Sequence, residues 1–394
     1  MVERLTATVV GGGIAGLASA ISLARAGWPV TVLERAPVFG EVGAGLGITR
    51  NGMTALDAIG VGAAVRAEGY ETVSAGFQDP CGRWLLRIPD TPDARATTRI
   101  WGIHRRRLHA ALLRAAEAAD GVELVTGAEV VDARPGRPGG EPATVTWRTA
   151  AGRRTTESAL VVAADGVRST VRERLFPHAR PRYSGSTSWR AVIPDTASGG
   201  PFVQFLGPGT EFGALRVNDG ELYWYGYFRH PEGVTFDDEP AAARAHFSGW
   251  SPRVRAIVAA TTAGQLMRHD VYHLPGGLAG YASGRVVMIG DAAHAMLPTA
   301  GQGASSAVED GVCVGRLIAA PVAAGSDLAA ALAAFDQARR PRCRRLARLS
   351  NTMAKVGADI GGGWRQAARN TMLRLTPARS LTKAAAPVVG WTAP

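Results

Sequence analysis

The sequence predicts an α/β protein in which a parallel-sheet domain is interrupted by a smaller antiparallel sheet and followed by helices. Three observations support this prediction. The chain begins with an apolar strand, a glycine-rich turn and a helix. Its middle part, 181–272, carries aromatic residues in short runs separated by turns, a pattern typical of an antiparallel sheet. A later apolar strand, Arg285–Ile289, then resumes the character of the first domain.

The first turn has the residues of a dinucleotide-binding site. Leu5–Val10 is a short β-branched run, as expected for a buried strand. Gly11, Gly13 and Gly16 follow with G-x-G-x-x-G spacing. These glycines allow a tight turn, a close approach of the backbone to a pyrophosphate, and packing of helix against strand. The helix predicted over Ile14–Ala26 directs its first N–H groups at the phosphates.

A second strand completes this unit. Val30–Leu33 is apolar and ends at Glu34, eighteen residues after Gly16. An acidic side chain at this place accepts hydrogen bonds from a ribose and disfavours a 2′-phosphate by charge repulsion. A glycine-rich turn without a ligand is the alternative for the motif alone. The complete order of strand, turn, helix, strand and Glu indicates a Rossmann-like domain.

Gly290-Asp291 follows the later strand, Arg285–Ile289. Alone, Asp291 would be interpreted as the cap of a helix that follows a strand. Because the chain already starts with a dinucleotide turn, this pair indicates a distant segment of the same site. Gly301 and Gly303 follow closely, at the predicted start of the next helix. Together the two segments predict a flavin dinucleotide rather than a generic Rossmann ligand.

Size and composition bound the class of protein. A chain of 394 residues exceeds the size of a single core, so we expect more than one domain. The mean hydropathy is +0.02, and no apolar run reaches the ~18 residues of a membrane-spanning helix. The three cysteines have no C-x-x-C spacing, which argues against a disulfide framework or a cysteine metal site. With no signal peptide after Met1, we expect a cytoplasmic protein without an integral membrane segment and without a bound metal.

The net charge of +11 does not by itself indicate a nucleic-acid-binding protein. Lys355 and Lys383 are the only lysines, and the arginines accompany abundant Ala and Gly, a bias typical of GC-rich coding. No recognised nucleic-acid module is present. The dense arginine run over 339–348 is expected to coat a late helix. A contact with an acidic partner or a membrane surface is the alternative.

The remaining elements give a four-part organisation. The glycine-rich segment Phe39–Gly47 is unsuited to a helix but suits backbone lying against a flat ligand. Other patterns predict a helix over Met53–Ile59, an amphipathic helix opened by His104–Leu108, and strands at Glu123–Val125, Val130–Ala133 and Leu160–Ala164. We predict an FAD-binding domain formed by 1–180 and 273–325, a substrate-binding domain at 181–272, and a C-terminal helical segment at 326–394.

With these motifs, the chain resembles a known family, the class A flavoprotein aromatic monooxygenases. This family includes para-hydroxybenzoate hydroxylase, salicylate hydroxylase and the FAD-dependent urate hydroxylases. The resemblance covers nearly the whole chain. It is carried by motifs in a fixed order: the Gly11–Gly16 turn with Glu34-Arg35, Arg105 before Leu108, Asp165-Gly166, Gly290-Asp291 continuing into Leu297–Gly303, and Glu309-Asp310.

The resemblance implies FAD as the cofactor. By position, Glu34 would hold the adenosine ribose, Arg105 the pyrophosphate side, and Asp291 the ribityl chain. Asp165-Gly166 resembles a pair linked to both FAD and NAD(P)H. The residues expected to bind the cofactor are Gly11, Gly13, Ile14, Ala15, Gly16, Glu34, Arg35, Gly45, Arg105, Val130, Asp165, Asp291, Gly301, Gly303 and Ala304.

The implied reaction is a two-stage cycle. NAD(P)H visits transiently and reduces FAD, and the reduced flavin takes O2 to form a C4a-hydroperoxide that hydroxylates an aromatic small molecule. Epoxidation of an alkene or an indole by the same intermediate is the nearest alternative. A flavin dehydrogenase or oxidase that inserts no oxygen is the alternative from a different class.

Substrate contacts are expected mainly from the 181–272 sheet. Arg190 is a candidate for holding a carboxylate, phenolate or carbonyl, and a surface arginine is the alternative. Tyr225 is the candidate for helping to deprotonate a phenol, with packing in the core as the alternative. Trp224 should face the other side of the strand. Pro298 is expected to fix the loop over the ring.

Two residues depart from the family pattern: Arg50 stands where Pro is usual, and Ser305 where Asn is usual. Arg50 is a candidate for binding an anionic substrate or NAD(P)H, and a solvated arginine is the alternative. The expected quaternary state is a monomer or a homodimer.

Overall fold

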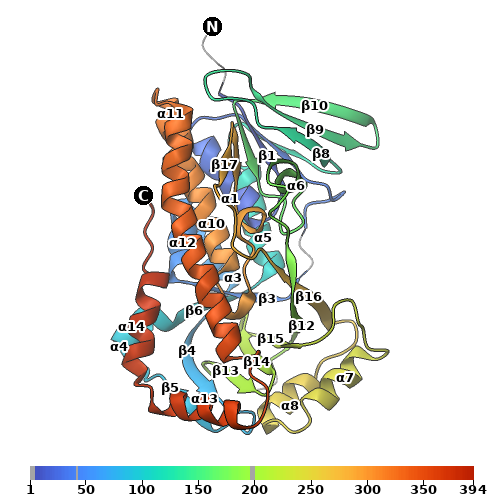
Figure 1. Cartoon of the computed structure of the whole chain (residues 1–394), viewed down its shortest axis with the longest axis vertical. Helices are drawn as coiled ribbons and strands as arrows, with labels where there is room; N and C mark the ends of the chain where they lie inside the picture. The colour runs from blue at the N-terminus through green and yellow to red at the C-terminus, as the bar shows by residue number, and fades with distance from the viewer. Residues whose placement is uncertain (1–4, 41–42, 196–199) are drawn as a thin grey trace.

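The computed structural model describes residues 5–40, 43–195 and 200–394. Glu41 and Val42, in the glycine-rich segment, lie outside these ranges. The chain forms two main sheets, one above the other, joined by long helices (Figure 1). The upper sheet has six strands in the order β17 (Ala282–Ser283), β18 (Val286–Met288), β11 (Leu160–Ala163), β1 (Ala7–Val10), β2 (Val30–Leu33) and β7 (Val122–Val125).

The six-stranded sheet is parallel apart from its edge strand β17. Its central strands are fully buried, because helices pack on one face of the sheet and the strands of a smaller antiparallel sheet pack on the other. The helices of this domain include α1 (Ile14–Arg25), α2 (Arg50–Ala58), α3 (Gly62–Glu68), α5 (Arg105–Glu117), α6 (Thr170–Leu175) and α10 (Gly303–Cys313). A three-stranded antiparallel sheet lies at its side, formed by β8 (Glu129–Arg134), β9 (Ala143–Thr149) and β10 (Gly152–Ser158).

The second main sheet has nine strands and is mostly antiparallel. Its order is β16 (Met267–His273), β12 (Arg182–Pro194), β15 (Glu221–Arg229), β14 (Thr210–Arg216), β13 (Phe202–Gly207), β4 (Tyr70–Gln78), β6 (Arg99–His104) and β3 (Gly45–Thr49), with β5 (Trp84–Arg87) paired to β4. The pairing of β13 with β4 is parallel. Four of these strands precede residue 181, so the sheet extends well beyond the 181–272 segment. The four-part domain division stays a prediction.

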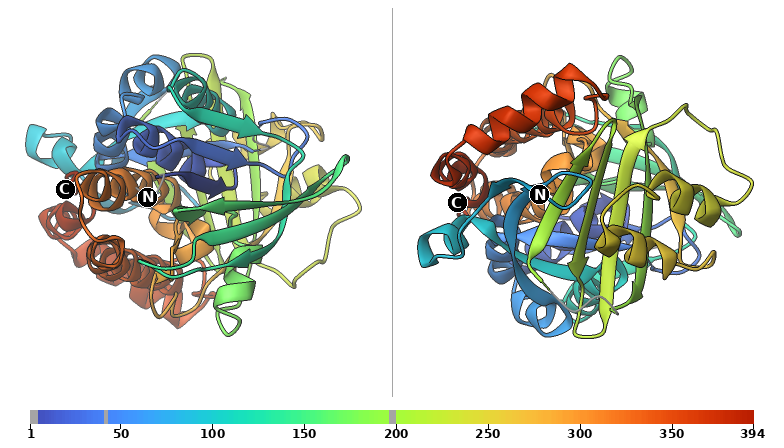
Figure 2. Two further views of the ribbon diagram at one scale, coloured as in Figure 1. Left: turned by 90° about the horizontal axis from the view of Figure 1, so that it is seen from above. Right: turned by 90° about the horizontal axis from the view of Figure 1, so that it is seen from below.

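Two helices cover one face of this sheet, α7 (Glu239–His246) and α8 (Pro252–Ala259) (Figure 2). The sequence pattern of the middle segment did not predict them. Phe247, directly after α7, and Ile257 of α8 pack with Trp189, Phe212 and Trp224 of the strands. Successive side chains of a strand point to opposite faces of the sheet. The side chains between these core residues therefore face the first domain.

The C-terminal segment consists of α12 (Leu328–Val356), α13 (Trp364–Leu375) and α14 (Ala378–Val389). Asp327 caps α12 by accepting a hydrogen bond from the N–H of Ala330. At 29 residues α12 is about 43 Å long, enough to run alongside both main sheets (Figure 1). The short elements before it are α9 (Asp291–His294), a 3-10 turn at Pro298–Ala300, a π-helical stretch at Val314–Ala319, and α11 (Ala320–Ala323); α4 (Pro92–Thr98) precedes β6.

The predicted elements of the first domain are confirmed. The first strand and helix are β1 and α1, and the second strand is β2. The helix predicted over Met53–Ile59 is α2, which begins three residues earlier because extended backbone at Thr49 turns directly into the helix. The predicted period-two separation also holds, since Trp224 packs under α7 and α8 whereas Tyr223 and Tyr225 belong to the clusters on the opposite face.

Candidate active site

Four candidate residues meet at the carboxyl edge of the six-stranded sheet. Strand β1 pairs with β2 and β11, and β11 pairs with β18, so all four strands end at the same edge. The residues that follow these ends are Gly11, Glu34, Asp165 and Asp291. In an open parallel sheet, ligands bind outside the carboxyl ends of strands, where neighbouring connections leave in opposite directions.

The turn between β1 and α1 is possible only with glycine. Gly11 has φ +102°, and a Cβ there would lie 2.5 Å from the carbonyl oxygen of Ala164. A Cβ on Gly16 would lie 1.9 Å from the carbonyl oxygen of Gly11. Helix α1 starts after Gly13 with no side-chain cap and no acidic residue in its first turn, which contains Ile14 and Ala15. Its first N–H groups are therefore suited to an anion such as a pyrophosphate.

Glu34 stands directly beside this turn. One carboxylate oxygen accepts a hydrogen bond of 2.7 Å from the N–H of Gly12, and the side chain remains half-exposed. Arg35 is exposed. The N–H of Ala128 donates to the carbonyl of Glu34, so the strand that carries Val130 begins next to the end of β2.

Gly290 connects the distant segment to the first helix. It has φ +55°, and a Cβ there would lie 2.9 Å from the Cβ of Ala15. Its N–H donates to Oδ2 of Asp310 over 2.8 Å. Asp291, the first residue of α9, is exposed and makes no side-chain hydrogen bond within the described ranges. The close contact of Gly290 with Ala15 thus brings Asp291, whose carboxylate is available, near the start of α1.

Arg172 is a further candidate site residue, which the sequence patterns did not reveal. Its fully buried guanidinium donates to the carbonyl oxygens of Ala179 and Ala292, the second residue of α9. Burial lowers the pKa of Arg172, while Asp165 and Asp291 raise it. Burial raises the pKa of Asp165, whose Oδ1 is a buried atom without a hydrogen-bond partner in the described chain. Arg172 thereby fixes the backbone of α9, and its charge interacts with the carboxylates of Asp165 and Asp291.

The edge strand β3 brings Gly45 against the second sheet. A Cβ on Gly45 would lie 2.5 Å from the Cβ of Tyr223. The backbone N–H of Arg105, the first residue of α5, donates to the carbonyl of Ala44. Burial raises the pKa of Tyr223, and the charges of Arg190 and Arg105 partly oppose this shift. The predicted pyrophosphate residue and the predicted substrate residue therefore lie near the same tyrosine.

The start of α10 is fastened to the end of β3. Gly301 has φ +62° and α10 begins at Gly303, followed by Ala304, without a side-chain cap. The amide of Gln302 donates to Thr49 Oγ1 over 3.0 Å, and Ser305, the departure from the family pattern, lies 3.4 Å from the same hydroxyl. The N–H groups of the first α10 turn remain available to a ligand.

A buried ionic network lies behind this helix. Arg339 of α12 donates to Glu309 Oε2 and to Asp310 Oδ1, each over 2.6 Å. Asp310 also bonds to His294 over 2.6 Å. Burial lowers the pKa of His294, but Cys343 and Asp310 together raise it well above its usual value. His294, Asp310 and Cys343 lie close together, and Arg339 donates to the last two.

The expectation that the arginine run simply coats a late helix is therefore wrong for part of it. Arg339 is buried, and Arg342 pairs with buried Glu309. Only part of the run, such as Arg345 and Arg348, is exposed. Because an α-helix has 3.6 residues per turn, a run of ten residues places some side chains toward the protein interior. Arginines at these positions need buried acidic partners.

Candidate substrate residues lie on the face of the nine-stranded sheet that is turned toward the first domain. Arg190 on β12 pairs directly with Tyr225 on β15. Leu297, the residue before Pro298, packs in one cluster with Tyr225 and Tyr227. Pro298 is exposed and starts the 3-10 turn. The structure thus brings Arg190, Tyr225 and the Pro298 loop to one region.

His269 is a second candidate site residue that no sequence motif indicated. It lies between Met267 and Val271 on β16, and these neighbours face the clusters that hold Tyr223 and Leu297. The alternation Met-x-His-x-Val was the available signal. His269 is exposed, and desolvation followed by the charges of Arg190 and Arg105 lowers its pKa. A neutral imidazole beside two cations can accept a proton.

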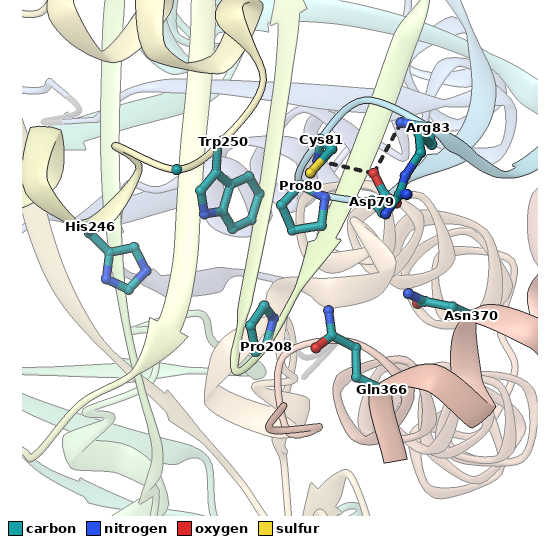
Figure 3. Close-up of a pocket in the computed structure, with 10 residues that line it drawn as sticks. Asp79, Pro80, Cys81, Arg83, Pro208, His246, Trp250, Gln366 and Asn370 are labelled. Carbon is teal, nitrogen blue, oxygen red and sulfur yellow. Dashed lines mark hydrogen bonds and ion pairs between the residues drawn. The ribbon is translucent and has the colours of Figure 1, made fainter. Parts of the chain in front are cut away.

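Two pockets lie outside this constellation. The larger, of about 720 Å³, is lined by Arg50, Asp90, Pro92, Arg95, Ala96, Arg99 and Trp101. The smaller, of about 360 Å³, lies where α13 meets the turns of the nine-stranded sheet (Figure 3). Its lining includes Cys81, Trp250 and Gln366 but none of the candidate site residues.

Comparisons with known proteins agree with this geometry. Residues 4–350 match the family model described as an FAD binding domain. The chain is 34% identical over 363 residues to the aurachin C monooxygenase/isomerase of Stigmatella aurantiaca, with 91% of each chain covered. It is 32% identical over 383 residues to the 2-heptyl-3-hydroxy-4(1H)-quinolone synthase of Pseudomonas aeruginosa, covering 95% of this chain and 94% of the other.

Solved structures show the same fold. The complex of Klebsiella pneumoniae HpxO with FAD and uric acid superposes with a TM-score of 0.85 at 24% identity, covering 99% of this chain and 97% of the other. The prediction of fold and family from ordered motifs is therefore confirmed. The chain belongs to the FAD-binding-domain family and is an FAD-dependent aromatic monooxygenase of the class A flavoprotein group, with NAD(P)H as its reductant.

Proposed function

We propose that this enzyme hydroxylates a planar, electron-rich aromatic small molecule bound between the nine-stranded sheet and the Pro298 loop. One observation carries the proposal: Arg190, Tyr225 and His269 lie on the sheet face that meets Leu297. Tyrosine rings and Leu297 suit a flat apolar ring, and the three polar groups suit its oxygen or N–H substituents. A quinolone is the first class to try, because two relatives act in quinolone or aurachin synthesis by name.

The residues at the carboxyl edge fit FAD. The glycine turn and the uncapped start of α1 suit a phosphate group, and the unpartnered Oδ1 of Asp165 can accept a hydrogen bond from a donor of the same ligand. We propose that Glu34 holds the adenosine ribose, Arg105 the pyrophosphate side and Asp291 the ribityl chain. The other proposed contacts are Gly11, Gly13, Ile14, Ala15, Gly16, Arg35, Gly45, Val130, Asp165, Gly301, Gly303 and Ala304.

Bound FAD would supply the oxidising chemistry with O2, and the side chains position the substrate and move its proton. Burial raises the pKa of Tyr225 well above its ordinary value, so its phenol stays protonated and donates a hydrogen bond rather than acting as a base. His269 is neutral and takes the proton from the substrate hydroxyl or N–H, which makes the ring carbon more electron-rich. Arg190 then stabilises the resulting oxyanion.

The pocket at Arg50 supports a place for the reductant. Arg50 begins α2 directly after Thr49, which bonds to the Gln302 loop, and it has no hydrogen bond or ion pair within the described ranges. Arg99 lies over the Trp101 ring at 5.8 Å. These cations suit the phosphates of NAD(P)H. An Arg50→Ala variant should raise the KM for NAD(P)H, and an unchanged KM would contradict this role.

The use of NAD(P)H, a cytoplasmic metabolite, supports a cytoplasmic location, and we keep a monomer or a homodimer as the expected quaternary state. Among the residues that the structure describes, no helix is long and apolar enough to cross a bilayer.

The decisive experiment supplies 18-O2 to the purified enzyme with NAD(P)H and a panel of quinolones, phenols and indoles. One labelled oxygen on a ring carbon is the expected result. A labelled epoxide would support the alternative of an alkene or indole epoxidase. A dehydrogenated product without label would establish the dehydrogenase or oxidase class and overturn the proposal.

A further inference from the structure

Helix α13 carries an apolar stripe that no other part of the described chain covers. Trp364, Met372 and Leu375 are 76%, 50% and 77% exposed, whereas the other exposed large apolar residues, Val38 and Val234, are isolated in connecting segments. At 100° per residue, these three side chains and exposed Ala368 fall within about 80° of the helix circumference. They therefore form one continuous face.

The opposite face of α13 anchors the helix to the protein. Arg369 and Leu373 are buried, and Arg369 donates to the carbonyl of Leu206 over 3.0 Å. Gln366 and Asn370 line the cavity between α13 and the sheet (Figure 3). Because the packing needs of the helix are already met on this side, the apolar stripe is not required for folding.

The surroundings of the stripe are strongly basic. Exposed Arg365 and Arg374 lie on its two sides by helical geometry, and the guanidinium of Arg365 is 5.6 Å from the Trp364 ring centroid. Residues 326–394 hold twelve of the Arg and Lys residues against three acids, a net charge of +9 within the +11 of the whole chain. The exposed cations of this segment include Arg345, Arg348, Lys355, Arg365, Arg374, Arg379 and Lys383.

We propose that α13 docks this enzyme on an anionic lipid surface. Trp364, Met372 and Leu375 enter the boundary between headgroups and acyl chains, while Arg365 and Arg374 pair with lipid phosphates. An apolar face with tryptophan, flanked by cations on a helix lying in the interface, is the known physical arrangement for such binding. A second copy of the chain is a poorer occupant, because self-association would bring two segments of charge +9 together. The proposal stands on this surface and does not depend on the substrate proposal.

The test mixes the holoenzyme with sucrose-loaded vesicles and measures co-sedimentation. We expect binding to vesicles of phosphatidylcholine with 30% phosphatidylglycerol, weak binding to phosphatidylcholine alone, and loss of binding as salt rises, since exposed charges are screened. The Trp364→Ser/Leu375→Ser variant should bind about tenfold more weakly. Each of Arg365→Gln and Arg374→Gln should weaken binding about fivefold.

Val234→Ser is the matched control, since it removes an exposed apolar side chain from a different surface and should leave vesicle binding unchanged. Circular dichroism and flavin content establish that each variant is folded. Absence of binding to anionic vesicles at low salt overturns the proposal, as does unchanged binding of the double variant. A sedimentation-velocity shift from dimer to monomer in the double variant, without vesicle binding, would instead identify a second copy as the occupant.

Discussion

His269 illustrates how one side chain acquires a chemical property from its neighbours. Desolvation and the charges of Arg190 and Arg105 lower its pKa, so the imidazole is neutral at pH 7 and ready to accept a proton. Tyr225 lies on the same sheet face, and burial raises its pKa, so its phenol stays protonated and can donate a hydrogen bond. Two groups whose environments separate their protonation states can act as an acid and base pair.

We predict that His269→Gln lowers the rate of substrate hydroxylation about 10²-fold, because the proton acceptor is lost. In the wild-type enzyme kcat/KM should fall as the pH drops below the lowered pKa of His269, and this acid limb should vanish in the variant. Steady-state rates from pH 5 to 9 test this. His178→Gln, at an exposed position, serves as the control. Retention of the acid limb in the His269 variant would exclude the proposed role.

Asp291 has the most specific proposed role at the cofactor. Its carboxylate is exposed at the start of α9 and makes no side-chain hydrogen bond among the described residues, so FAD would provide its partner. Loss of a hydrogen bond to a charged group costs about 1.5–3 kcal/mol, which corresponds to a 10- to 100-fold weaker affinity. Asp291→Ala should show this loss in a fluorescence titration of the apoenzyme with FAD. Asp291→Asn, which keeps an acceptor, should lose less, and equal affinities in all three proteins would refute the assignment.

At the scale of elements, α10 is held in place by a helix that lies far along the chain. Arg339 of α12 pairs with Glu309 and Asp310, and Asp310 in turn accepts from the N–H of Gly290. The network therefore links the start of α9, α10 and α12 in the interior. A buried guanidinium has to keep its carboxylate partners, because a buried charge that loses its partner is strongly destabilising.

Arg339→Met should lower the free energy of unfolding by about 3–5 kcal/mol, since the buried carboxylates of Glu309 and Asp310 lose their shared cation and keep Arg342 and His294 as their cationic partners. Arg340→Ala is the matched control one residue along. It removes a partly exposed pair with Asp336, four residues away, and should cost at most about 1 kcal/mol. Urea unfolding followed by circular dichroism measures both. Equal effects of the two substitutions would show that the buried network contributes no special stability.

The elements themselves were largely predictable where one periodicity dominates. The strand–turn–helix start, β2 and α5 follow directly from apolar period and glycine spacing. Helices α7 and α8 were not predicted, because they lie within a segment rich in aromatic strands and are only eight residues each. Short helices are stabilised by packing, here on Trp189 and Trp224, rather than by their own sequence.

For the whole molecule, Glu211 joins the nine-stranded sheet to the C-terminal segment. Its fully buried carboxylate accepts from the N–H of Ala358 and from the amide of Gln204. Burial raises its pKa to about 7 from an ordinary 4.5, because the charged form loses its hydration. The folded protein therefore keeps this proton up to about pH 7, whereas the unfolded chain releases it near 4.5.

Between these two values the folded state binds more protons, so this group should make the free energy of unfolding fall as the pH rises. The decrease should amount to about 3 kcal/mol in total and be complete above pH 7. A Glu211→Gln variant should lack this component, and its stability relative to wild type should be greatest at pH 8. Unfolding midpoints at pH 5, 6, 7 and 8 test this. Parallel pH profiles for the two proteins would contradict it.

The sequence by itself determined the fold class, the cofactor and the enzyme family, because glycine turns and strand ends impose local constraints that act over a few residues. It also predicted that Glu34, Asp165 and Asp291 belong to one cofactor site. The tertiary structure alone decided which polar residues are buried together. Arg172 between two carboxylates, Arg339 inside the network, and His269 beside Arg190 depend on contacts between distant segments. Burial and neighbouring charge set the protonation of such groups, and neither can be read from a single stretch of chain.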